Sequence, residues 1–354
     1  MKFTDSISSS VQAVCTADHS SHTGGSTSGL WGRIHLPLLR GMFLLAVGLA
    51  IGVVHAQATY PSRMITIVVP YPAGGTTDML ARSVAEVLRR RSGQNVVVDN
   101  QPGAGGSLAG RRVIGAAPDG YTLLMTSSGI NSVVPTTYKD FKPIEGLTQV
   151  SVLVDVPFVM VVNNEFPAKT LGDFLTYAKK ASGQVSIGNV GLGSHGHLAQ
   201  LLFSKAAGVD FLSVPYKGST PAINDLLGGQ INAILDNVGV QKPFIDSHKV
   251  TPLFVTSARR SPALPQVPTA VELGLPFESI AWFGLAVPRA TSPAVVQYLR
   301  ETISAGFQDP EQLSKLTMAG LTPVFSTSAQ ANARAIADTH TLSPLAAALN
   351  LPAN

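Results

Sequence analysis

The sequence predicts an α/β protein of two lobes, each built on a doubly wound, mainly parallel β-sheet, with a ligand cleft between the lobes. Short runs rich in valine and isoleucine alternate with segments that have a helical spacing of apolar residues, which is typical of parallel sheets with helical connections. Two long apolar stretches, at 150–163 and 279–288, are suited to cross between lobes. Polar, glycine-rich loops follow the strands, where open α/β sheets bind their ligands.

The first 58 residues are expected to be a leader that ends in a cleaved signal peptide. An apolar run at 41–54 follows Arg33 and Arg40 and precedes His55-Ala56-Gln57-Ala58. A basic segment, an apolar segment and an A-x-A site indicate cleavage after Ala58. The apolar run is 14 residues long, whereas a membrane-spanning helix needs roughly 20. The sequence therefore predicts export, and residues 1–30 are assigned no function.

Charge and cysteine content exclude several classes of protein. The net charge of +4 is spread thinly along 354 residues, and no basic tract has interleaved aromatics, so nucleic acid is not an expected partner. The run Arg89-Arg90-Arg91 ends a helical segment, where cations suit the helix dipole. The single cysteine, Cys15, lies in the leader, so the processed chain has no thiol for a disulfide or a thiolate metal site. We expect no bound metal and a monomer.

The predicted elements follow one another in a regular order after the leader. Strands are expected at 64–70, 95–98, 122–126, 151–162, 185–189, 211–215, 231–235 and 251–256, and helices at 77–90, 107–116, 171–181, 197–207, 221–228, 293–308 and 329–338. If the two long stretches cross between lobes, the first lobe takes both ends of the chain. The first lobe would comprise 59–158 and 284–354, and the second lobe 159–283.

The loop after the first strand, Tyr71-Pro72-Ala73-Gly74-Gly75-Thr76-Thr77-Asp78, has the composition of an anion site. Two glycines let backbone N–H groups turn toward a ligand, Thr76 or Thr77 can cap the helix, and a helix N-terminus attracts anions. A plain capped turn is the alternative. We expect Asp78 to hold the loop by accepting backbone N–H bonds, because a carboxylate aimed at an anion would repel it.

The equivalent loop of the second lobe runs from Asn189 to His197 and contains the spacing G-x-G-x-x-G. A dinucleotide site would also need an acidic residue at the end of the next strand, whereas Tyr216-Lys217 stand there. His195 and His197 are spaced as H-x-H, for which we expect a capping or loop-bracing role rather than metal binding. Ser194 beside His195 leaves a Ser/His hydrolase as an alternative, although G-x-S-x-G is absent.

Two further loops, at 100–106 and 215–221, also join a strand to a helix. Lys217 could neutralise a carboxylate, but a solvated surface lysine is the commoner outcome. Asp236-Asn237 follow a strand and could either line the cleft or only cap a helix. Walker-A spacing is absent, so nucleotide hydrolysis has no support.

Five blocks of the sequence together resemble a known family. In chain order they are PYPAGGTTDMLAR, NQPGAGGSLAG, APDGYTLL, VPYKGSTPAINDLLGGQINAILDN and TSARRSPALPQVPT. Over residues 60 to about 337 the chain is similar to the Bug (TctC-like) family, the periplasmic receptors of tripartite tricarboxylate transporters. The resemblance implies a type II periplasmic binding protein fold, a periplasmic location, no catalysis and no cofactor.

The resemblance also implies the partners of the protein. These would be the membrane components of a transporter and a small carboxylate, whether a di- or tricarboxylate, an acidic amino acid or an aromatic acid. A receptor that signals to a membrane sensor is a further alternative, because both roles share the capture step.

Family members hold one ligand carboxylate between two loops, largely by backbone N–H groups and hydroxyls. Carried over by motif, the first binding loop is 71–78 and the second is 191–197, with Ser194 as the expected hydroxyl donor. This chain departs from the family pattern at Gln101 and at His195-Gly196. The expected ligand-binding residues are Tyr71, Ala73, Gly74, Gly75, Thr76, Thr77, Asp78, Ser127, Ser128, Gly191, Gly193, Ser194, His195, His197 and Asp236.

Overall fold

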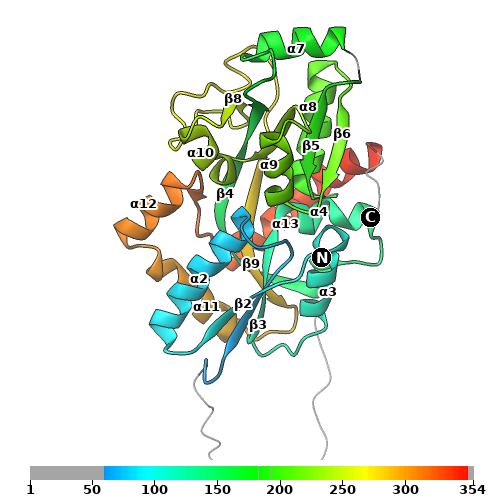
Figure 1. Ribbon diagram of the computed structural model, residues 1–354. Coiled ribbons are helices and arrows are strands. Elements are labelled where there is room, and N and C mark those ends of the chain that lie inside the picture. Colours follow the sequence, from blue (N-terminus) through cyan, green and yellow to red (C-terminus); the bar gives the residue numbers. More distant parts are fainter. Residues whose placement is uncertain (1–59, 182, 192, 350–354) are drawn as a thin grey trace, which may run out of the picture. The chain divides into compact units, whose positions relative to one another are not determined.

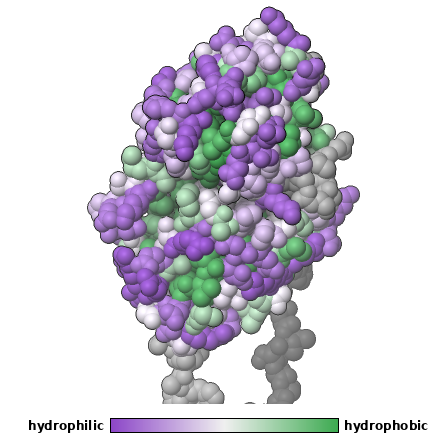
Figure 2. Space-filling model, viewed as in Figure 1, coloured by the Kyte–Doolittle hydropathy of each residue, from purple (hydrophilic) through white to green (hydrophobic). Residues whose placement is uncertain are grey.

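The structure is a computed structural model that describes residues 60–181, 183–191 and 193–349. The predicted leader and signal peptide lie outside these residues. Within the described ranges, no helix combines the length and the apolar character needed to cross a bilayer. On the face shown in Figure 2, hydrophilic residues cover most of the outer surface and hydrophobic ones form separate patches.

The first group of strands pairs around β1. Strand β1 (Ile65–Val69) runs parallel to both β2 (Val96–Asn100) and β3 (Thr122–Ser127). Its side chains alternate between two cores, as the twofold period of a strand requires. Ile65, Ile67 and Val69 pack with helix α2 (Thr76–Ser92), whereas Val68 packs with helix α3 (Ser107–Ile114) on the other face.

The second group of strands is built in the same way. Strand β5 (Ser186–Val190) runs parallel to β6 (Leu212–Tyr216) and β7 (Ala233–Asn237). Helices cover this group on both faces, so the predicted alternation of strands and helices is confirmed. The remaining elements of this group are α7 (Leu171–Lys180), α8 (His195–Ala207), α9 (Ser219–Leu227), α10 (Val238–Asp246) and β8 (Val250–Val255).

Both long apolar stretches are strands, and one of them joins the two groups (Figure 1). Strand β4 (Leu147–Asn163) pairs with β9 (Ile280–Pro288) as far as Pro157 and with β7 from Phe158 onward. The predicted lobe boundaries, at 158 and 283, remain a proposal, and this change of partner supports the one at 158.

The sheets are mixed rather than mainly parallel. The predicted parallel order holds among β1, β2 and β3 and among β5, β6 and β7, but every pair that involves β4 or β9 is antiparallel. Strands that leave a lobe and return to it run in opposite directions. A buried strand has the same apolar composition whether it pairs in parallel or antiparallel, so the sequence pattern does not predict the direction of β4 and β9.

Further helices complete the first group. The longest, α13 (Ser328–Ala348), begins with a capping box formed by Thr327 and Gln330. It continues ten residues beyond the predicted end at 338, where Ser343 Oγ donates to Ser132 O at 2.6 Å. The other elements are η1 (Ala104–Gly106), α4 (Ser128–Ser132), α5 (Val134–Thr137), α6 (Pro143–Gly146), α11 (Pro293–Gly306), α12 (Pro310–Met318) and β10 (Thr322–Pro323).

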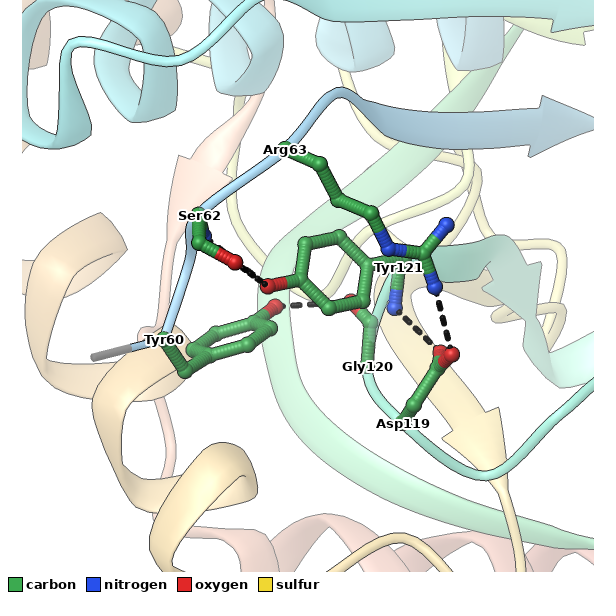
Figure 3. Close-up of polar contacts among 6 residues, drawn as sticks. All are labelled: Tyr60, Ser62, Arg63, Asp119, Gly120 and Tyr121. Atoms are coloured by element: carbon green, nitrogen blue, oxygen red, sulfur yellow. Dashed lines mark hydrogen bonds and ion pairs between the residues drawn. The ribbon is translucent and has the colours of Figure 1, made fainter. Parts of the chain in front are cut away.

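The start of the described chain is fastened to the turn that precedes β3 (Figure 3). Tyr60 Oη donates to Gly120 O at 2.7 Å, and Arg63 Nη2 donates to Asp119 Oδ2 at 2.6 Å. The Arg63 guanidinium also lies 4.0 Å from the centre of the Tyr121 ring. The APDGY part of the recognised blocks therefore anchors the chain and takes no part in the pocket described below.

Candidate functional site

A pocket lies where the loops after β1, β3, β5, β6 and β7 meet strands β4 and β9. Its cavity volume is about 60 Å³, room for about five water molecules or a compact ligand. Most of the predicted site residues line it: Tyr71, Ala73, Gly75, Thr76, Thr77, Ser127, Ser128, Ser194, His195 and Asp236. Gly74, Asp78, Gly191, Gly193 and His197 do not.

Helices α2, α8, α9 and α10 all begin at this pocket. Helix α2 has Gly75 as its N-cap and α9 has Gly218, and neither cap supplies a side-chain hydrogen bond. The prediction that Thr76 or Thr77 caps α2 is therefore wrong, because they are the first and second residues of the helix itself. Uncapped helices keep free N–H groups and a positive dipole end, which attract anions. Among the described residues that line the pocket there is no lysine or arginine.

Thr76 carries the clearest sign of a missing partner. Its side chain is 2% exposed, yet its Oγ1 has no hydrogen-bond partner within the described structure. The Oδ1 atom of Asn237, which also lines the pocket, is unpartnered as well. An unsatisfied buried polar group costs about 1–3 kcal/mol, so both atoms point to a polar ligand.

Asp78 holds the first binding loop, as predicted. Its Oδ2 accepts the N–H of Gly74 at 3.0 Å and Nε of Arg82 at 3.0 Å. Burial alone would raise the pKa of Asp78, but the hydrogen bonds from Arg82 and Gly74 outweigh it and the pKa is lowered. Asp78 therefore stays ionised, and it is not among the residues that line the pocket.

The two glycines of the first loop differ in backbone conformation. Gly74 has a φ of +88°, a conformation that side chains rarely adopt, whereas Gly75 has an extended φ of −84°. The positive φ of this loop therefore falls on Gly74, whereas Gly75 lines the pocket. A Cβ on Gly75 would meet nothing closer than 4.0 Å, so in the protein alone its site tolerates a side chain.

The second binding loop is braced from within. Ser194 is the N-cap of α8, and its Oγ accepts the N–H of His197 at 3.2 Å. His197 Nδ1 in turn accepts the N–H of Gly193 at 3.2 Å, so the predicted bracing role of His197 is confirmed. Burial lowers the pKa of His197 to about 4, which keeps the ring neutral and able to accept this bond.

His195 lies in the wall of the pocket and contacts two serines distant in sequence. Its Nδ1 is 2.7 Å from Ser128 Oγ and its Nε2 is 3.2 Å from Ser279 Oγ. Burial, and secondarily the positive charge of Arg334, lowers the pKa of His195 to about 4. Neither ring nitrogen bonds Ser194, and no carboxylate contacts the ring in the described structure. A Ser194–His195 hydrolase dyad is therefore not formed.

Asp236 lines the pocket, which is one of the two roles that the sequence left open, and the N-cap of α10 is Asn237. The carboxylate of Asp236 accepts the N–H of Asn237 at 2.7 Å and Nε2 of Gln241 at 3.3 Å, at the start of α10. Burial raises the pKa of Asp236, against the opposing effect of hydrogen bonds from Ser219 and these two partners.

Sequence reasoning missed several lining residues. Gly218, Ser219 and Thr220 lie in the loop 215–221 after β6 and line the pocket, although they were not among the expected ligand-binding residues. The general rule that ligands bind after parallel strands would have found them. Pro72 and Gly196 lie inside the two predicted binding loops, and Asn237 follows Asp236 at the strand end that the sequence singled out. Phe158, Ala281 and Phe283, the apolar wall supplied by β4 and β9, were not expected. A strand that crosses between lobes has to border the cleft, which was the available signal.

A second, larger cavity of about 540 Å³ lies beside the first and shares Tyr71 with it. Gly191, the loop 102–106 and the exposed Lys217 line this outer cavity. The loops that separate the cavities touch: a Cβ on Gly218 would lie 3.2 Å from Pro72. Lys217 is thus outside the inner pocket, at the surface.

Comparison with known proteins gives similarity over most of the chain. The family described as tripartite tricarboxylate transporter family receptor, TctC, matches residues 80–351. Protein BugT of Bordetella pertussis is 36% identical over 291 residues, 81% of this chain and 89% of that protein. The structure of R. palustris Rpa4515 with adipate is 34% identical, with a TM-score of 0.79, and the match covers 81% of this chain and 97% of that one. MatC from Rhodopseudomonas palustris with bound malate is 30% identical, with a TM-score of 0.76, over 81% of this chain and 100% of that one.

Proposed function

This chain belongs to the family of tripartite tricarboxylate transporter receptors, and on that premise we propose that it captures a small carboxylate and delivers it to the membrane components of such a transporter. It is a solute-binding receptor and not an enzyme. The periplasm is its proposed location, reached by cleavage of the signal peptide after Ala58. The basic and apolar segments before that site support this.

The unpaired hydroxyl of Thr76 carries the proposal. It lies in a pocket onto which four helix N-termini open and whose described lining has no basic side chain. Backbone N–H groups and hydroxyls are the donors that such a pocket offers. They suit a carboxylate, which accepts several hydrogen bonds at once. The bound carboxylate would satisfy Thr76 Oγ1 and the uncapped amides of α2 and α9.

The size and walls of the pocket narrow the class of ligand. A cavity of about 60 Å³ suits a compact carboxylate, and Phe158, Ala281 and Phe283 supply apolar contact for its carbon skeleton. Two structural relatives hold adipate and malate, which are small dicarboxylates. We propose a ligand of this kind; an acidic amino acid or an aromatic acid would use the same donors.

A thermal-shift screen of organic acids on the processed chain tests the proposal. A ligand at 100 times its dissociation constant should stabilise the protein by about 2.7 kcal/mol. The screen should include each acid and its primary amide, because the donors of the pocket favour the carboxylate. If no di- or tricarboxylate, acidic amino acid or aromatic acid shifts the melting temperature, the proposal fails.

A further inference from the structure

The contacts of His195 link three buried side chains from separate parts of the chain. Ser128 begins helix α4, His195 begins helix α8 and Ser279 immediately precedes β9. All three are less than 10% exposed. The imidazole lies between the two hydroxyls, with 2.7 Å from Nδ1 to Ser128 Oγ and 3.2 Å from Nε2 to Ser279 Oγ. The ring also leans on Phe158, at a centroid distance of 5.7 Å.

The hydroxyl of Ser279 decides which ring nitrogen carries the proton. Within the described residues, the contact with His195 Nε2 is the one hydrogen bond of Ser279 Oγ. Buried donors without an acceptor are rarer than buried acceptors without a donor, so Ser279 gives its proton to Nε2. A neutral imidazole has one N–H, which is then on Nδ1.

The proton on Nδ1 in turn determines whether Ser128 Oγ donates or accepts a hydrogen bond on the side of the pocket. A hydroxyl accepts through two lone pairs and donates one proton. Ser128 Oγ accepts from the N–H of Trp282 at 3.5 Å and, in this arrangement, from His195 Nδ1–H as well. Both lone pairs are then occupied and the proton is left over. Ser128 lines the pocket, where that proton has a ligand as its acceptor.

We propose that His195 is a positioning residue, held by Ser279 as the Nδ1–H tautomer, that makes Ser128 a hydrogen-bond donor to the ligand. Ser279, His195 and Ser128 all donate in the same direction, toward the pocket, and bonds aligned in this way strengthen one another. In the opposite tautomer Nδ1 would accept a hydrogen bond from Ser128, whose remaining lone pair would then face the ligand.

This inference rests on the proposed function and adds to it. The hydroxyl of Ser128 would select which chemical group of the ligand can lie next to it. A carboxylate oxygen is accepted there, whereas an amide nitrogen or an ammonium group would meet a donor.

The tautomer is measured directly by NMR on protein with ¹⁵N-labelled histidine, without any ligand. Long-range ¹H–¹⁵N correlation distinguishes a protonated ring nitrogen from a bare one, and the signals of His195 are assigned by their loss in His195→Asn. We expect the proton on Nδ1, and in Ser279→Ala a mixture of the two tautomers. A proton on Nε2 in the unaltered protein overturns the proposal. This NMR measurement needs no ligand and is valid even if no carboxylate binds. It can therefore contradict the inference about His195 independently of the proposed function.

Two substitutions of His195 test the consequence for binding. The amide of His195→Asn reaches the position of Nδ1 and can donate to Ser128, whereas the amide of His195→Gln reaches the position of Nε2 and leaves Ser128 without that donor. For the carboxylate found in the screen, His195→Asn should bind within about threefold of the unaltered protein and His195→Gln at least about tenfold more weakly.

His340, which is exposed, supplies the matched controls His340→Asn and His340→Gln, which should bind as the unaltered protein does. Equal affinities of the two His195 variants overturn the proposal. If either variant fails to fold, as circular dichroism would show, the NMR measurement on the unaltered protein and on Ser279→Ala still decides it.

Discussion

Replacing Thr76 with valine should stabilise the free protein and weaken ligand binding. Valine keeps the shape of threonine and removes a hydroxyl that is buried and unpartnered at the first turn of α2. An unpaired buried hydroxyl costs about 1–3 kcal/mol, so the free energy of unfolding should stay level or rise by up to that amount. A hydrogen bond to a charged group contributes about 1.5–3 kcal/mol, so affinity for the carboxylate should fall by about tenfold to a hundredfold.

Urea denaturation gives the stability and isothermal titration calorimetry gives the affinity of the same preparation. Thr136→Val is the matched control, because Thr136 Oγ1 donates to Val133 O at 2.7 Å, away from the pocket. Loss of this hydrogen bond in Thr136→Val should destabilise the protein by about 1 kcal/mol and leave the affinity for the carboxylate unchanged. A Thr76→Val protein that is clearly less stable than the unaltered protein, yet binds as tightly, would refute the reasoning.

Three further predictions concern pH, the contact between helices and the outer cavity. The pKa of both His195 and His197 is about 4 in the folded protein, against about 6.5 in an unfolded chain, so unfolding takes up protons between these values and stability falls as the pH drops. Each histidine should lower the free energy of unfolding by about 2 kcal/mol between pH 7 and pH 5. Urea titrations at the two pH values should therefore show a smaller loss of stability for His197→Gln than for the unaltered protein. A Cβ on Gly129 would lie 2.7 Å from the backbone nitrogen of His195, so Gly129→Ala should separate α4 from α8 and lower the affinity for the carboxylate at least about tenfold. Normal binding of this variant in calorimetry would contradict the prediction. Gly172→Ala is the control, because a Cβ on Gly172 would meet nothing closer than 4.0 Å. Because Lys217 lies outside the inner pocket, Lys217→Ala should weaken binding by less than about tenfold, or 1.4 kcal/mol; a hundredfold loss in the same assay would show that a charge pair dominates.

The positions of the binding loops could be predicted because they depend on local order along the chain. A strand followed by glycines and a helix puts its loop at the carboxyl end of the sheet, which brought Thr76, Ser128 and Ser194 into one pocket. The internal bracing by Asp78 and His197 could be predicted as well, since each contacts a residue four positions away.

The rest depended on geometry that sequence spacing does not carry. Gly74 and Gly75 look equivalent in the sequence, and only the path of the chain decides which of them has the positive φ. The partners of His195 lie 67 residues before it and 84 residues after it, so no local pattern announces them. The antiparallel pairing of β4 and β9 depends on the path of the chain before and after these strands, and not on their amino-acid composition.

The central claim is that a pocket without basic side chains among its described lining holds a carboxylate through hydroxyls and backbone N–H groups at helix N-termini. The most direct test is a pair of ¹H–¹⁵N correlation spectra, without ligand and with the saturating carboxylate identified by the screen. Amide protons that donate to a carboxylate move downfield, so the account predicts the largest downfield shifts at Thr76 and Thr77 of α2 and at Ser219 of α9. Largest shifts at Lys217 and the loop 102–106, with the amides of Thr76 and Ser219 unmoved, would place the ligand in the outer cavity and contradict the account.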